Sequence, residues 1–399
     1  MGFGYHGEVS KRPRTVTFDG APAPGVINFG VGQPSPDLLP VDLLRTASAD
    51  FMAHAHALEL NYGERQGDEG FRTALAGFLT SSYEHPVSAG SLLVTGGNSQ
   101  ALDFICGHFA KEGDTVFIEE PSYFLAHRIF SDHGLQVVGI PMDEDGLIID
   151  ALVKKLAIHR PVLLYTIPSY HNPTGKTLSG ERREALARLS LEHDFLVVAD
   201  EVYQLLNYFD KPPAAMGTMT DRGNILSLGS FSKIMAPGLR LGWIQTSDGL
   251  MQRLLDTGVI NSGGSFNHFT SHVVRHAIEL GLQGSLLQHL RTSYGQRLET
   301  MDLALHRHLG SLAGWARPCG GYFFWLEFDR TVDTTELRTH AARFKTGFQP
   351  GAVFSCTGGL NNCLRLSFAH YGTDDIAEGV ARLGALLIDL PHSRTVKSV

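Results

Sequence analysis

The chain has few cysteines, no long apolar run and no excess of positive charge. Its 399 residues contain four scattered cysteines, too few for a disulfide framework, which favours free thiols in a reducing cytoplasm. No apolar run reaches the roughly 18 residues of a transmembrane helix, and residues 1–17 lack the apolar core of a signal peptide. We therefore expect a cytoplasmic protein with no membrane partner.

Charge and histidine spacing exclude two further classes of protein. The formal net charge of −8 argues against a nucleic-acid partner. The 19 histidines show none of the spacings typical of metal ligands, so no metal site is predicted.

Short apolar runs alternate with amphipathic stretches through the middle of the chain. The runs that predict strands are 92–95, 115–119, 136–141, 162–167, 196–199, 225–228 and 240–246. Helix-like stretches such as 180–194 separate several of them. This pattern favours an α/β fold with a mostly parallel seven-stranded sheet between helices. In such sheets the ligand binds beyond the carboxyl ends of the strands.

The pattern changes from about residue 282. A long helical stretch, 284–309, leads to a strand-like run at 321–328 and then to an α+β tail. We predict a large domain over residues 46–289 and a smaller α+β domain formed by residues 1–45 and 290–399.

A lysine and an arginine follow the run 225–228. The sequence S-F-S-K places Ser230 and Ser232 beside Lys233, whose amine can attack an aldehyde to form an imine. Arg240 carries a guanidinium suited to a phosphate. Taken alone this motif is weak, and a solvated lysine is the alternative. Together these side chains can bind an aldehyde and a phosphate.

Polar residues follow four other predicted strands. Asp200 ends one run, where an acid can pair with a pyridinium nitrogen, and Tyr203 follows it. Asn172 lies in an N-P-T-G turn, which holds its amide in place. Glycines followed by Asn98 and Ser99 open a helix, where free N–H groups bind anions. Tyr123 follows the run 115–119 and can stack on a pyridine ring. Each motif alone also fits a plain turn, cap or core residue, but all five occur together.

These motifs resemble those of the fold-type I, class I/II aminotransferases, which depend on pyridoxal 5′-phosphate (PLP). The similarity runs from residues 28–34 to residues 365–368 and is closest to the branch of 2-aminoadipate and kynurenine aminotransferases. It implies a PLP-dependent transferase that moves an amino group from an L-amino acid to a 2-oxo acid. It also implies a homodimer with shared active sites, in which Tyr62 reaches the phosphate of the neighbouring subunit.

The resemblance implies a role for each candidate residue. Lys233 forms the Schiff base with PLP and then moves the Cα proton, while Asp200 pairs with the ring nitrogen. The implied catalytic residues are Lys233, Asp200, Tyr203 and Tyr123. The implied cofactor-binding residues are Tyr62, Asn98, Ser99, Tyr123, Asn172, Asp200, Tyr203, Ser230, Ser232, Lys233 and Arg240. The implied substrate-binding residues are Arg365, which binds the α-carboxylate, together with Asn172 and Gly32.

The sequence departs from this branch at three places. Asn98 stands where the branch usually has serine, so its contact with the phosphate is open. His171 precedes the N-P-T-G turn, and Arg65 follows Tyr62 closely. Both could touch an unusual substrate or be harmless replacements that lie behind the site.

Two other functions stay open at this point. The same fold and cofactor support β- or γ-elimination, replacement, or oxidation of an amino acid. The third reading is a ligand-binding module without catalysis, as in transcription regulators that carry an aminotransferase-like domain. Turnover of an amino acid by the purified protein distinguishes them.

Overall fold

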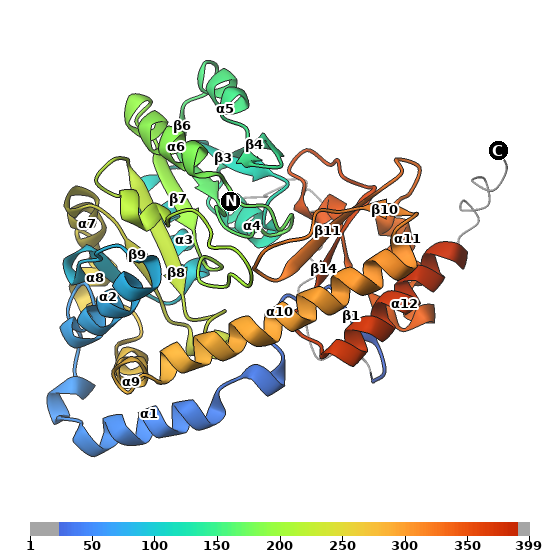
Figure 1. Cartoon of the computed structure of the whole chain (residues 1–399). Helices are drawn as coiled ribbons and strands as arrows, with labels where there is room; N and C mark the ends of the chain where they lie inside the picture. The colour runs from blue at the N-terminus through green and yellow to red at the C-terminus, as the bar shows by residue number, and fades with distance from the viewer. Residues whose placement is uncertain (1–23, 390–399) are drawn as a thin grey trace, which may run out of the picture.

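The computed structural model describes residues 24–389. An eight-stranded sheet lies at its centre, with the strand order β2-β9-β8-β7-β6-β3-β4-β5 (Figure 1). Seven of these strands coincide with the seven predicted runs: β2 (Leu92–Thr95), β3 (Thr115–Glu120), β4 (Gln136–Asp143), β6 (Pro161–Thr166), β7 (Leu196–Asp200), β8 (Ile225–Ser230) and β9 (Gly242–Gln245). The eighth, β5 (Gly146–Leu147), has only two residues, too few for a periodicity to reveal it.

Most neighbouring strands of this sheet are parallel. The pairs β4–β3, β3–β6, β6–β7 and β7–β8 are parallel. Strand β9 is antiparallel to both β8 and β2, so β2 points in the same direction as β8. The carboxyl ends of β2, β3, β6, β7 and β8 therefore meet at one edge of the sheet. The polar residues that follow these strands are brought together there.

Both faces of the sheet are buried. Side chains of successive strand residues point to opposite faces, so Val198 packs in one core with Tyr165 while Val197 packs in another with Leu164. Helices α3 (Asn98–Phe109) and α4 (Phe124–Asp132) contribute to the first core. Helices α5 (Ile149–Leu156) and α6 (Gly180–Glu192) contribute to the second. The predicted α/β sandwich is confirmed.

The remaining helices flank this sandwich and continue past it. Helix α1 (Val41–His54) and α2 (Glu69–Tyr83) both pack on α9 (His268–Glu279). Two short helices, α7 (Asp248–Leu255) and α8 (Gly258–Gly263), lead from β9 to α9. The 28-residue helix α10 (Leu282–Leu309) then runs to α12 (Thr373–Asp389), as Figure 1 shows.

A second, antiparallel sheet forms the smaller α+β part. Its order is β10 (Ala313–Gly314), β11 (Phe323–Phe328), β14 (Cys363–Ser367) and β13 (Gln349–Pro350), with α11 (Thr334–His340) beside it. Strand β1 (Ile27–Asn28) pairs in parallel with β12 (Thr346–Gly347), which joins the start of the described chain to this part. The segment 29–32 consequently lies near β14, since Ser367 N donates to Phe29 O at 2.8 Å.

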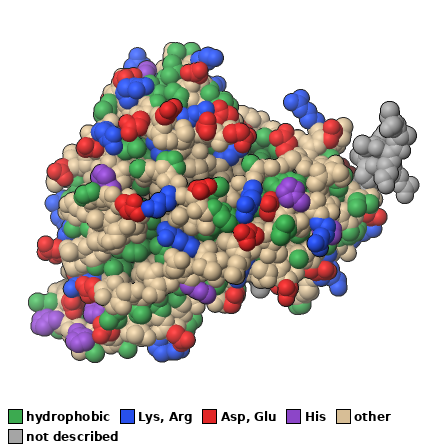
Figure 2. Space-filling view, in the orientation of Figure 1, with side chains coloured by type: hydrophobic (Ala, Val, Ile, Leu, Met, Phe, Trp, Pro, Cys, Tyr) green, Lys and Arg blue, Asp and Glu red, His purple; other side chains and the backbone are tan. Residues whose placement is uncertain are grey.

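The surface carries acidic and basic side chains close to one another. Figure 2 shows them interspersed on the face in view. Within residues 24–389, no helix is long and apolar enough to cross a membrane. The same residues contain no cluster of histidine, cysteine, aspartate or glutamate side chains that could hold a metal ion.

Candidate active site

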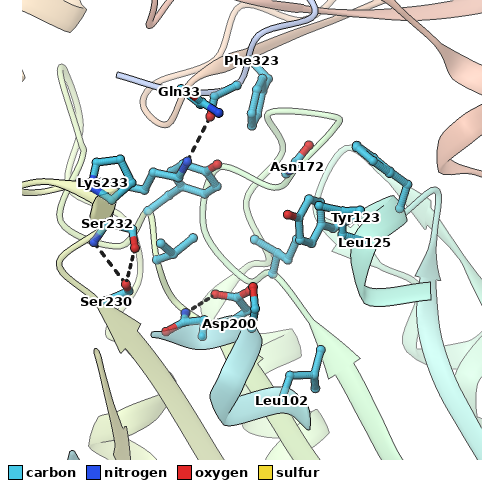
Figure 3. Close-up of a pocket in the computed structure, with 18 of the residues that line it drawn as sticks. Gln33, Leu102, Tyr123, Leu125, Asn172, Asp200, Ser230, Ser232, Lys233 and Phe323 are labelled. Carbon is cyan, nitrogen blue, oxygen red and sulfur yellow. Dashed lines mark hydrogen bonds between the residues drawn. The ribbon is translucent and has the colours of Figure 1, made fainter. Parts of the chain in front are cut away.

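A cavity of about 630 Å³ lies where the strand ends of the large sheet face the smaller α+β part (Figure 3). Almost every residue predicted for the site lines it. Those residues are Gly32, Asn98, Ser99, Tyr123, Asn172, Asp200, Tyr203, Ser230, Ser232, Lys233, Arg240 and Arg365. The exception is Tyr62, which lies outside the cavity and is 82% exposed.

Lys233 projects into the cavity from the turn that follows β8. Its Nζ donates to the carbonyl oxygen of Gly32 at 3.0 Å and lies 5.3 Å from the centre of the Tyr322 ring. Burial, together with the positive charge of Arg365, lowers the pKa of Lys233 to about 8. The unprotonated fraction of this amine near neutral pH is therefore far larger than that of an ordinary lysine, and a nucleophile or a base requires the unprotonated form.

Asp200 ends β7 at the bottom of the cavity, and both its carboxylate oxygens accept hydrogen bonds. Asn98 Nδ2 donates to Oδ1 at 2.6 Å, and the Tyr165 hydroxyl donates to Oδ2 at 2.8 Å. Burial raises the pKa of Asp200, while these two donors act in the opposite direction. The carboxylate is thus oriented by two neighbours and keeps lone pairs for a cationic N–H.

The position of Asn98 differs from the expected phosphate contact. Its side chain turns under the cavity toward Asp200 and the carbonyl oxygen of Leu228, 3.3 Å away. Tyr165 has no counterpart in the motifs of the sequence, because it lies within a strand and its spacing indicates only core packing. It could have been found only from its place on β6, beside the strand that carries Asp200.

The amino end of α3 forms one wall of the cavity. Gly97, its N-cap residue, has a φ of +87°, and no side chain caps the helix, so the first N–H groups are free for an anion. A Cβ at Gly97 would stand 2.8 Å from Nη2 of Arg240. Arg240 Nη1 also donates to the Ser232 hydroxyl at 3.4 Å, and Ser230 donates to Ser232 at 2.9 Å. The Arg240 guanidinium, the two serine hydroxyls and the amino end of α3 therefore surround one small volume.

Arg365 enters the cavity from β14 and is 3% exposed. Its Nη1 donates to Asn172 Oδ1 at 2.9 Å, and its Nη2 donates to the carbonyl oxygen of Gly30 at 3.0 Å. The guanidinium also lies 4.1 Å from the centre of the Phe323 ring. No carboxylate among residues 24–389 pairs with it, and burial lowers its pKa to about 10. A buried arginine without an acidic partner is typical of a site that binds an anionic ligand.

The two predicted tyrosines lie close to the same volume. Tyr203 is 3% exposed, and its hydroxyl donates to no described residue. Burial raises its pKa, so the hydroxyl stays protonated and can donate to a ligand oxygen. Tyr123 lies at the start of α4, and burial raises its pKa to about 12.

His171 and Arg65 do not line the cavity. His171 is buried, with Nε2 3.0 Å from a carboxylate oxygen of Glu119 and Nδ1 3.0 Å from the Thr174 hydroxyl. Arg65 donates to the carbonyl oxygen of Leu255, far along the chain from the site motifs. For His171, the structure therefore supports the plainer of the two interpretations, a role behind the site.

The donor set fits PLP at each of its functional groups. A lysine of lowered pKa suits the aldehyde, and a buried carboxylate suits the ring nitrogen. The uncapped helix end, two hydroxyls and Arg240 suit the phosphate. No observation in the cavity opposes this cofactor.

Comparisons with known proteins agree with this assignment. Residues 24–383 match the family model described as aminotransferase class I and II. The chain is 31% identical to 2-aminoadipate transaminase of Thermus thermophilus, over 91% of this chain and 90% of that protein. It is also 31% identical to an uncharacterized HTH-type transcriptional regulator of Bacillus subtilis, over 90% of this chain and 73% of the relative.

Solved structures give the same result. The kynurenine aminotransferase of Pyrococcus horikoshii superposes with a TM-score of 0.86 at 28% identity, covering 94% of this chain and 92% of that one. The family and its members support transamination over elimination, replacement or oxidation. The chain belongs to the PLP-dependent aminotransferases of class I and II.

Proposed function

We propose that this aminotransferase uses the cavity residues in the roles that the family resemblance implies. The observation that carries the proposal is that three groups meet at one cavity. They are Lys233 of lowered pKa, the doubly hydrogen-bonded Asp200, and Arg365, which has no carboxylate partner among residues 24–389. In this order, the three groups suit the aldehyde of PLP, the ring nitrogen of PLP and the carboxylate of the substrate.

PLP, when bound, supplies an aldehyde that condenses with amines and a ring that accepts electrons from the substrate α-carbon. In our proposal Lys233 would hold that aldehyde through its Nζ. The same Nζ, whose pKa burial lowers to about 8, would act as the base at the substrate α-proton. Asp200 keeps a proton on the ring nitrogen, and Arg365 holds the α-carboxylate so that the Cα–H bond faces Nζ.

The remaining cavity residues hold the cofactor in place. We assign the phosphate to Ser99, Ser230, Ser232, Arg240 and the free N–H groups of α3. Tyr203 and Asn172 donate to the phenolic oxygen, and Tyr123 stacks on the ring. The Asn98 side chain acts through Asp200 because its amide donates to that carboxylate, while its backbone N–H is one of the free N–H groups at the start of α3.

The test is a half-reaction on the purified protein. Amino acids are added one at a time without a 2-oxo acid, and the absorption spectrum and products are recorded. Conversion of bound PLP to pyridoxamine phosphate, with release of the matching 2-oxo acid, is expected. Ammonia release with regeneration of PLP would contradict transamination. Absence of any change with every amino acid would favour a ligand-binding module, as in a regulator.

We also propose a homodimer in which Tyr62 serves the site of the neighbouring subunit. Tyr62 is 82% exposed and does not reach its own cavity. Four other apolar side chains, on α1, on α9 and on the segment Ala57–Leu60 that precedes Tyr62, are also more than half exposed: Met52, Leu58, Leu60 and Phe269. Large apolar side chains exposed on neighbouring segments are typical of a protein interface.

Mixing two inactive variants tests the shared site. In a mixed dimer of Tyr62→Ala and Lys233→Ala subunits, one site keeps its own Lys233 and receives Tyr62 from the other subunit. Random mixing should restore about a quarter of wild-type activity, because half the dimers are mixed and each has one intact site. No restoration, with dimers confirmed by sedimentation, would mean that Tyr62 does not act across subunits.

We propose two domains, residues 46–289 and residues 1–45 with 290–399. The separate sheets support this division, although both boundaries fall within helices, α1 and α10, which therefore join the parts. Residues 1–23 and 390–399 lie outside the described residues. The four free cysteines support a cytoplasmic location, which cell fractionation tests.

A further inference from the structure

The antiparallel sheet places a glutamine directly beside Arg365. Gln349 in β13 pairs with Arg365 in β14, and side chains of such a pair leave the same face with Cβ atoms about 4.5–5.5 Å apart. Gln349 lines the cavity and is only 9% exposed. No motif of the sequence marks it, because it lies in a short strand of only two residues.

Arg338 determines which end of the Gln349 amide is free. Arg338 Nη1 donates to Gln349 Oε1 at 3.1 Å. A guanidinium only donates, so this contact fixes Oε1 as the acceptor and leaves Nε2 as a free donor. Nε2 faces Gly30, where an added Cβ would stand 3.4 Å from it. Arg365 Nη2 donates to the carbonyl oxygen of the same Gly30. The two donors therefore flank one residue.

Of these two donors, Arg365 Nη2 has an acceptor within the described chain, the carbonyl oxygen of Gly30, and Gln349 Nε2 has none. Gln349 Nε2 donates to none of residues 24–389, and neither Arg338 nor Arg365 pairs with a carboxylate among them. Arg365 Nε is buried and also has no hydrogen-bond partner among these residues, so a ligand oxygen beside Gln349 and Arg365 would satisfy both side chains. A carboxylate has two oxygens that accept about four hydrogen bonds, enough for a guanidinium and an amide together.

We propose that Gln349 Nε2 donates a hydrogen bond to the α-carboxylate of the substrate, beside Arg365. Arg338 is the positioning residue that keeps the amide turned that way. The inference rests on the proposed role of Arg365. The α-carboxylate is common to the amino acid and the 2-oxo acid, so Gln349 strengthens the binding of every substrate and does not select among side chains.

Steady-state kinetics of three variants test the proposal. Gln349→Met keeps the size of the side chain and removes the donor. It should raise KM for the amino acid and for the 2-oxo acid by the same factor, about tenfold or more, since the lost bond is to a charged group. Arg338→Met, which frees the amide to rotate, should raise both KM values by a smaller common factor. Cofactor affinity should stay unchanged in both.

Arg343→Met is the matched control. Arg343 is a surface arginine with a side chain 68% exposed, close to Asp389, and its replacement should change neither KM. A rise of KM for only one substrate would overturn the proposal, as would a loss of thermal stability with unchanged KM. If Gln349→Met does not fold, Gln349→Glu replaces it. The new carboxylate should compete for Arg365 and raise both KM values, and unchanged values would overturn the proposal.

Arg365→Met separates this inference from the proposed function. If Arg365→Met raises KM strongly while Gln349→Met does not, only the role of Gln349 is wrong. If neither variant changes KM, the assignment of the carboxylate site is wrong, and both proposals fall.

Discussion

Replacing Asn98 by leucine should raise the pKa of Asp200. Asn98 Nδ2 is one of two side-chain donors to this buried carboxylate, at 2.6 Å, and the leucine keeps a similar volume without the donor. A hydrogen bond to a charged group contributes about 1.5–3 kcal/mol. One pKa unit corresponds to about 1.4 kcal/mol, so the loss should raise the pKa of Asp200 by about one to two units.

The sign of the effect determines the assay. Asp200 already has a pKa raised by burial, and the donors oppose that shift by stabilising the ionised form. The variant should therefore lose the ionised carboxylate at a higher pH than the wild type does. Carbon-13 NMR of aspartate-labelled protein without PLP measures this titration directly. As the pH is lowered from 8 to 5, the PLP affinity of the variant should begin to fall at a correspondingly higher pH than that of the wild type.

Two further variants make the result decisive. Tyr165→Phe removes the other donor, at 2.8 Å, and should produce a shift of similar size. Asn361→Leu, on an exposed turn of the smaller α+β part, should leave the titration unchanged. An unchanged pKa of Asp200 in Asn98→Leu, with the fold intact by circular dichroism, would refute the contact. A selective loss of phosphate affinity would instead restore the phosphate role that the sequence suggested.

Three other replacements have defined outcomes. Lys233→Met should stabilise the protein without PLP at pH 7. Burial lowers the pKa of Lys233 to about 8 in the folded state, so the cost of burying the protonated amine is largest below that pH. The gain in melting temperature of the variant over the wild type should therefore shrink as the pH rises above 8. A gain that does not depend on pH would contradict this reasoning. Arg365→Met should raise KM for the amino acid about 100-fold and leave PLP affinity unchanged, because a bidentate charged contact with the substrate is lost. An equal loss of substrate affinity and PLP affinity would contradict the role of Arg365. His171→Leu removes the close contact with the buried Glu119 carboxylate, which keeps its hydrogen bonds from Thr166 and Ile167. It should lower the free energy of unfolding by about 1–3 kcal/mol without altering substrate preference, which denaturant titration and kinetics measure together.

The sequence predicted the large sheet nearly completely. Strands buried on both faces are continuous apolar runs, and all seven runs became strands. The same runs located the site, since each motif follows a strand whose carboxyl end lies at the ligand edge. Lys233, Asp200, Asn172 and Arg240 could therefore be assigned to one cavity from their positions along the chain.

Contacts between distant side chains were decided only by the tertiary structure. Asn98 follows glycines at a helix start, which indicates an anion contact, yet packing of α3 against the end of β8 turns its amide toward Asp200. His171 lies next to Asn172 in sequence, but the turn directs the two side chains oppositely, one to the cavity and one to Glu119.

The sequence by itself predicted the fold class, the cofactor and most of the polar residues that line the cavity. Strand periodicity and the order of the motifs along the chain are local properties, which one sequence expresses directly. Only the tertiary structure brought Tyr165 to Asp200 and Gln349 to Arg365. Those pairs depend on the register between neighbouring strands, and a shift by one residue would turn each side chain to the other face.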